Sequence, residues 1–327
     1  IRPSHVLTLG DEEGEGFGTE APTLVRGVSR YFLKASNDPS RIKMYDRQGT
    51  YVGALGREGD GPGEFREIVD IGLLKGDTLL ALDRGLHRLS IFGPDLELVN
   101  TITLPIRPED ESLTILPDGT FLVRGNALTQ ELTGIPHHQF DTSGNLLRSF
   151  GDPQVRGSPL GSAYYRPTSS GTTGTLWISH QEEYRLTEWS LEGERGRVLH
   201  PVRSWYEDAR LGTVTREADG ALPPRSWILD VSTTPDGLVW VLGRTPDPDW
   251  RESLGPDGQR ESLEEYFDSV LDVIDPDAGR LIATFRMTEG LFHGFLDSEH
   301  VYGVVYEQYA PRNAIWRIEL TGANPSR

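Results

Sequence analysis

The feature that most constrains the fold is a group of four short apolar runs separated by turn residues, clearest within the stretch 50–104. The runs lie at about 68–73, 78–83, 86–92 and 97–104. The breaks between them are Lys75-Gly76-Asp77, Arg84-Gly85 and Gly93-Pro94-Asp95. Because glycine permits a positive φ and proline fixes the bend, these breaks predict tight turns. Four short strands joined in this way form an antiparallel meander, the unit from which a β-propeller is built.

The unit recurs along the chain, which predicts an all-β fold: one domain over 1–327, a six-bladed β-propeller of four-stranded antiparallel blades. The predicted blades span about 21–56, 66–104, 112–151, 163–202, 227–286 and 291–320. The last unit shows only three strands, whereas the run at 4–9 is a single alternating strand with no partner nearby. We therefore expect this N-terminal strand to close the last blade, because closure leaves no chain-terminal edge to fray.

Two insertions interrupt the pattern, at 203–226 and 244–267. In an antiparallel blade the outer-to-inner connections and the turns between the second and third strands emerge on the same side, so both insertions open on one face. Connections of this length are uncommon in compact domains unless they bind something or pack on themselves. Their aromatic residues are candidates for binding: Trp205, Tyr206, Trp250, Tyr266 and Phe267. The alternative is that these aromatics cover the rim of blades four and five. The segment 262–271 is also compatible with a short helix.

The net charge of −18, from 50 acidic and 32 basic residues, disfavours nucleic acids and anionic membrane surfaces as partners. It leaves a protein partner, a second copy of the chain, or cations. No apolar run approaches the roughly 18–20 residues of a membrane-spanning helix. The chain starts at Ile1 and not at Met, which favours a processed protein that is secreted, extracellular or periplasmic. The absence of cysteine excludes disulfides and leaves the compartment open.

The pattern Gly-x-Gly-Pro-Gly-Glu-Phe at 59–65, followed by Leu-Ala-Leu-Asp at 80–83 and Leu-His-Arg-Leu-Ser-Ile-Phe at 86–92, resembles the NHL-repeat family. The similarity is good over about 20–104, and later units match by period and not by motif. The resemblance implies a six-bladed propeller with a binding or scaffolding role. It also implies that Asp83 and Arg88 are framework residues that hold a turn. A fold of this kind does not fix an activity.

Candidates for chemistry are sparse. Calcium prefers about six to eight oxygen ligands, and Asp70 and Asp230 on the innermost strands are the weak candidates for a channel metal. The histidines at 137, 138, 180, 200 and 293 lack the repeat-equivalent spacing of a zinc site. No Gly-x-Ser-x-Gly motif between a strand and a helix, and no cysteine, offers a nucleophile.

The sequence hypothesis is therefore a secreted, non-catalytic binding or scaffold propeller. In a stronger form it self-associates, as a homo-oligomer or a filament, into an extracellular assembly. The alternative is a calcium-dependent hydrolase or lyase on the same fold. The sequence leaves the question of enzyme activity open and favours the non-catalytic hypothesis.

Overall fold

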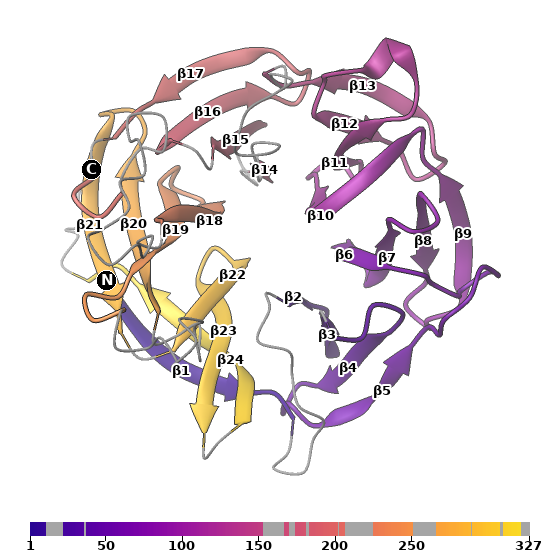
Figure 1. Cartoon of the computed structure of the whole chain (residues 1–327), viewed down its shortest axis with the longest axis horizontal. Helices are drawn as coiled ribbons and strands as arrows, with labels where there is room; N and C mark the ends of the chain where they lie inside the picture. The colour runs from indigo at the N-terminus through magenta and orange to yellow at the C-terminus, as the bar shows by residue number, and fades with distance from the viewer. Residues whose placement is uncertain are drawn as a thin grey trace, which may run out of the picture.

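The computed structural model of the protein describes residues 1–10, 22–35, 37–152, 167–169, 174–180, 183–201, 203–206, 225–250, 266–288, 290–307 and 310–321. They form six four-stranded antiparallel sheets, arranged around a central axis as the blades of a propeller (Figure 1). The predicted fold class is confirmed. No helix within these ranges is both long enough and apolar enough to cross a membrane.

The first three blades follow one another along the chain, each from its inner to its outer strand. Blade 1 comprises β2 (Thr23–Arg26), β3 (Arg30–Lys34), β4 (Ile42–Asp46) and β5 (Tyr51–Leu55). Blade 2 comprises β6 (Ile68–Leu74), β7 (Thr78–Asp83), β8 (Arg88–Phe92) and β9 (Leu98–Thr103). Blade 3 comprises β10 (Ile106–Ile115), β11 (Phe121–Ala127), β12 (His137–Phe140) and β13 (Leu146–Phe150), with the 3-10 turn η1 (Gln130–Leu132) before β12.

The remaining blades complete the ring. Blade 4 comprises β14 (Pro167–Ser169), β15 (Thr175–His180), β16 (Arg185–Ser190) and β17 (Arg195–Leu199). Blade 5 comprises β18 (Trp227–Thr233), β19 (Val239–Pro246), β20 (Phe267–Asp275) and β21 (Arg280–Met287). Blade 6 comprises β22 (Leu291–Asp297), β23 (His300–Glu307), β24 (Ala310–Glu319) and, as its outer strand, β1 (Arg2–Thr8).

The N-terminal strand closes the ring, as the sequence predicts. Strand β1 pairs antiparallel with β24, from Arg2 opposite Glu319 to Thr8 opposite Ala314 (Figure 1). The backbone N–H of Leu9 continues the pairing with a 2.8 Å bond to the carbonyl of Asn313. Closure by the two ends of the chain satisfies the outer edge of β24, which would otherwise stand unpaired.

The core lies between the blades, and each of the six seams holds one hydrophobic cluster. Between blades 2 and 3, for example, Leu82 and Ile91 pack against Phe121 and Phe140. Side chains of a strand alternate between its two faces, so each sheet contributes to two seams at once. This requirement explains why second strands such as β7 and β19 begin as nearly continuous apolar runs.

Polar side chains reinforce three consecutive seams at the rim. At each of these seams, the side chain of the third residue of an outer strand donates a hydrogen bond to a backbone carbonyl of the next blade, in the turn between its third and fourth strands. These bonds join Asn100 Nδ2 to Thr142 O at 3.3 Å, Arg148 Nη1 to Leu191 O at 2.9 Å, and Arg197 Nη1 to Pro276 O at 3.1 Å. Asn100 also accepts the N–H of Thr101 at 2.8 Å, which covers part of the open edge of β9.

Two local expectations need correction. The inner strand of blade 3 begins at Ile106 and not near residue 112, because an irregularity between Pro108 and Leu113 inserts residues without ending the strand. Glu111 lies in this irregularity with a φ of 48°. The expected helix at 262–271 is wrong over its second half, because Phe267 begins β20; its residues 262–265 lie outside the described residues.

Candidate functional site: the loop face

The connections divide the propeller into two unlike faces. We call the side with the first-to-second and third-to-fourth strand turns the turn face. The opposite side, with the second-to-third turns and the outer-to-inner connections, is the loop face. Turn-face connections are short, whereas the long ones, at 9–22, 56–67, 151–166, 200–226 and 247–266, all leave and re-enter the sheets at strand ends on the loop face. The predicted placement of both insertions on one face follows from this strand order.

Within one turn-face connection, hydrogen bonds join residues close in sequence, and bonds from the neighbouring blade, such as Val28 N–H to Asp77 at 2.9 Å, add to them. Asp46 Oδ1 accepts the backbone N–H groups of Gln48 and Thr50 at 2.9 and 2.8 Å. Gly49 completes the turn at a φ of 86°, a conformation that favours glycine. Asp141, with Ser143, Asn145 and Gly144, repeats this arrangement in blade 3. Such a turn forms from its own residues, and its acceptor is only half-buried, so water still reaches it.

The loop face, by contrast, buries charged and titratable side chains. Each of blades 1 to 4 has one such side chain on its second strand, at the residue that pairs with the first residue of the third strand. These residues are Lys34, Asp83, Arg124 and His180, and none is more than 8% exposed. In blade 5, Arg244 lies two residues before the end of β19 and is 5% exposed. Burying a charge is unfavourable unless it is paired, so each of these positions needs fixed partners.

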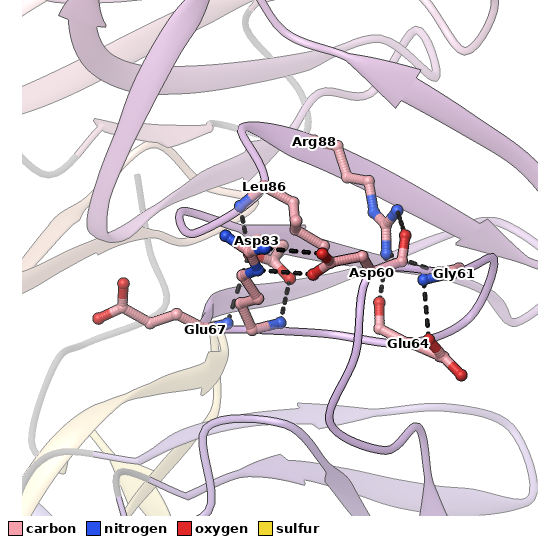
Figure 2. Close-up of polar contacts among 8 residues, drawn as sticks. Asp60, Gly61, Glu64, Glu67, Asp83, Leu86 and Arg88 are labelled. Atoms are coloured by element: carbon pink, nitrogen blue, oxygen red, sulfur yellow. Dashed lines mark hydrogen bonds and ion pairs between the residues drawn. The ribbon is translucent and has the colours of Figure 1, made fainter.

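The connection 56–67, which carries the Gly-rich motif, is fastened by Asp83 and Arg88 (Figure 2). Asp83 accepts the backbone N–H groups of Arg66 and Leu86 at 2.8 and 2.9 Å and that of Glu67 at 3.4 Å. Arg88 donates to the carbonyls of Asp60 and Gly61 at 3.0 and 2.9 Å, and to that of Glu64. These contacts are those of framework residues, as the family resemblance implies.

Glycines and a buried phenylalanine shape the same connection. Phe65 is fully buried, and a Cβ on Gly56 would approach its ring to 2.7 Å. The N–H of Gly61 donates to Glu64 at 2.8 Å, and with Arg57 it holds the pKa of that carboxyl below its usual range. Two arginines extend the charge network to blade 3. Arg84 bridges Glu67 and Asp110, and the buried Arg124 pairs with Glu109.

A fully buried carboxylate, Asp272, anchors the start of the insertion after blade 4. Its Oδ2 accepts hydrogen bonds from the Tyr184 hydroxyl and Arg203 Nε, both at 2.8 Å, and from Trp205 Nε1 at 3.2 Å. Its Oδ1 accepts the Thr284 hydroxyl at 2.5 Å. Burial, followed by the charge of Asp272, raises the pKa of Tyr184 well above its usual value. The four donors come from three elements, the β15–β16 connection, the connection 200–226 and β21, so Asp272 ties blades 4 and 5 to the connection 200–226.

The predicted binding aromatics fall into two packed groups. Trp205 and Tyr206 meet Tyr184 edge-on, with ring centroids 5.6 and 5.4 Å apart. The ring of Trp250 packs edge-on against that of Tyr266, with centroids 5.6 Å apart. Tyr266 in turn packs edge-on against Phe267, with centroids 4.9 Å apart. Tyr206, Trp250 and Phe267 are buried, and Trp205 and Tyr266 are half-buried. Their packing accords with the covering role that the sequence left open, and a role in binding stays a prediction.

Asp70 and Asp230 occupy equivalent positions on the inner strands of blades 2 and 5, which the sequence pattern did not reveal. Each accepts the N–H of its following residue at 2.9 and 2.8 Å. Each also accepts an inner-strand N–H of the next blade, from Leu113 at 2.8 Å and from Phe295 at 2.9 Å. They therefore cap open edges around the channel. Within the described ranges, no group of three or more His, Cys, Asp or Glu side chains is placed to hold a metal ion.

The histidines at the start of β12 are buried and neutral at ordinary pH. Burial, with smaller effects from Arg124 and His138, lowers the pKa of His137 to about 3. Burial lowers the pKa of His138 to about 4, although backbone hydrogen bonds oppose this shift. His138 Nδ1 lies 2.8 Å from the Ser149 hydroxyl, and the ring of His137 lies 5.9 Å from that of Phe150. These contacts give both rings a place in the packing of blade 3.

Comparison with known proteins supports the architecture. The model of a family described as a 6-bladed beta-propeller, DUF5128, matches residues 23–125. No curated protein matches the chain.

Several solved structures share the fold. A member of the DUF4221 family from Bacteroides vulgatus has a TM-score of 0.63 at 10% identity, covering 96% of this chain and 97% of its own. A Bacteroides fragilis protein described as exported has a TM-score of 0.60 at 10% identity, covering 98% and 95%. The virginiamycin B lyase of Staphylococcus aureus has a TM-score of 0.53 at 9% identity, covering 97% and 99%. At such identities the likeness concerns the fold alone.

Proposed function

We propose that the protein is an exported, non-catalytic binding propeller whose loop face recognises a protein partner or a second copy of the chain. The observation that carries the proposal is the asymmetry of the two faces. In the part of the chain that the structure describes, the loop face combines long connections with buried ion pairs such as Arg203–Asp272, which fix the bases of those connections. A rigid scaffold that presents loops on one face is the usual arrangement of a binding surface.

Three further points support the proposal. The NHL-like motif at 59–65 is similar to that of propellers with binding or scaffolding roles. The net charge of −18 favours basic or neutral partners over nucleic acids. One structural neighbour is described as exported, and we extend export to this chain as part of the proposal. Self-association into an extracellular assembly is the stronger form of the same hypothesis.

Site-specific photo-crosslinking in the source cells tests the proposal. The probe replaces exposed Glu58 on the loop face or, as the matched control, Val28, which is 81% exposed on the turn face. We expect a discrete crosslinked product from position 58 and none from position 28; a product of twice the chain mass identifies self-association. Equal products from both positions, or none from position 58, would refute a loop-face binding role. Turnover in a hydrolase and lyase substrate screen would contradict the non-catalytic part.

A further inference from the structure

Two carboxylates face each other where the long connection of blade 5 leaves and re-enters its sheet. Asp247 follows the last residue of β19, and Asp268 is the second residue of β20. The strands pair up to Pro246 opposite Phe267, and the N–H of Asp247 donates to Tyr266 O at 3.1 Å. The two acids therefore mark the base of the connection 247–266.

The oxygens of Asp268 are unequally satisfied. Its side chain is 1% exposed, and its Oδ2 accepts Arg286 Nε at 2.5 Å. Its Oδ1 is buried and has no hydrogen-bond donor among the described residues. Burial raises the pKa of Asp268; Arg286 opposes the rise, and the adjacent Asp247 carboxylate adds to it, through its charge and within hydrogen-bonding reach.

Among the described residues, this pair of acids is one cation short. Arg286 balances one of the two negative charges and bonds Oδ2 of Asp268, whereas Oδ1 of Asp268 has no donor there and Asp247 Oδ1 accepts the backbone N–H of Asp249 at 2.7 Å. Like charges this close repel unless a proton or a metal ion separates them. Asp247 is half-buried, so the pair is within reach of solvent and of a hydrated ion.

We propose that Asp247 and Asp268 bind a divalent cation of the calcium class at the base of the connection 247–266. Asp268 Oδ1 and the Asp247 carboxylate supply up to three oxygens and water completes the shell, so a dissociation constant on the order of 10⁻⁴ to 10⁻³ M is expected. The ion joins the end of β19 to the start of β20 and so fixes the turn that carries Trp250. The site is distinct from Asp70 and Asp230 and does not depend on the proposed binding role.

Terbium luminescence provides a direct test, because Tb³⁺ occupies calcium sites and Trp250 lies in the same turn. The Trp250 N–H donates to the carbonyl of Asp247 at 3.2 Å. We expect saturable emission on excitation of tryptophan in the wild-type protein, displaced by Ca²⁺. The emission is lost in Asp268→Asn and in the more exposed Asp247→Asn. Trp250→Phe loses the emission but keeps Ca²⁺ binding by calorimetry.

The control is Asp236→Asn, which removes the same charge from an exposed turn-face position of the same blade and keeps the wild-type emission. Equal emission from Asp236→Asn and Asp247→Asn would show that the ion binds the acidic surface in general, and would overturn the site. So would an absence of saturable binding in the wild type. If Asp268→Asn stabilises the protein while Ca²⁺ leaves the wild-type melting temperature unchanged, the pair shares a proton and the proposal is wrong.

Discussion

The connections of the turn face and of the loop face join the same strands, but different kinds of hydrogen bond hold them. On the turn face, Asp46 bonds residues two and four positions away and stays in contact with water. On the loop face Asp83 is fully buried, and so is Asp272, which lies within β20 where it holds the loop-face connection 200–226; both bond groups brought from other strands or from the neighbouring blade. Short-range bonds form independently of the rest of the ring. Long-range bonds make the shape of the loop face depend on many groups at once, so breaking one has a larger effect.

Asp272→Ala gives the largest expected effect. The change leaves Arg203 buried without its carboxylate, and we expect the free energy of unfolding to fall by about 3–5 kcal/mol in urea titrations. Thr284→Val removes a single donor to the same acid and is the matched control, with an expected loss of about 1 kcal/mol. A loss for Asp272→Ala no larger than that of the control would mean that Arg203 escapes to water and that the loop face is not fixed in this way.

The acid sensitivity of the loop face comes next. Because burial depresses the pKa values of His137 and His138 to about 3 and 4, protons bind the unfolded chain first. The contribution of the two neutral histidines to the free energy of unfolding is fully present above about pH 6.5. It is lost as the pH falls towards these pKa values, and the loss is about 3 kcal/mol per histidine at pH 4.

Urea unfolding at pH 7 and pH 4 measures this loss. Carboxylates also titrate in this window, so the double variant His137→Gln/His138→Gln is compared with the wild type to isolate the imidazoles. The variant is expected to show a much weaker dependence on pH. The same dependence in both proteins would count against buried, neutral histidines.

A matched pair of aspartates compares the two faces directly. Asp83→Ala removes the acceptor of three partly buried N–H groups, and we expect a loss of about 2–3 kcal/mol. Asp46→Ala removes an acceptor of two exposed N–H groups that water can satisfy, and a loss of about 1 kcal/mol or less is expected. Thermal or urea unfolding of both variants gives the difference. Equal losses would remove the energetic distinction between the faces.

Much of the fold was predictable because its signals are local. The breaks at 75–77 and 93–95 became turns, and the spare strand at 4–9 became the outer strand of blade 6. The motif at 59–65, with Asp83 and Arg88, implied the framework role that the hydrogen bonds show. The start of blade 3 was misplaced, because an irregular strand has no alternating pattern to mark its first residues.

The partners of buried polar groups were not predictable. Asp272, Asp70 and Asp230 each interrupt an apolar run, which signals a buried acid in need of donors. The sequence did not indicate that Asp70 and Asp230 cap equivalent edges of the channel. The backbone N–H groups that they accept, those of Leu113 and Phe295, lie in the next blade. The approach of Asp247 to Asp268 likewise arises only when β19 and β20 pair.

By itself, the sequence determined the number of blades, the closure by the N-terminal strand and the face on which the long connections lie. These follow from turn residues and strand periods, which act over a few neighbouring positions. Only the tertiary structure decided which polar groups meet across the seams, and that Trp205 and Tyr206 pack beside Asp272. The physical reason is that a buried charge takes its partners from whatever strands the ring brings together, however far apart they lie in the chain.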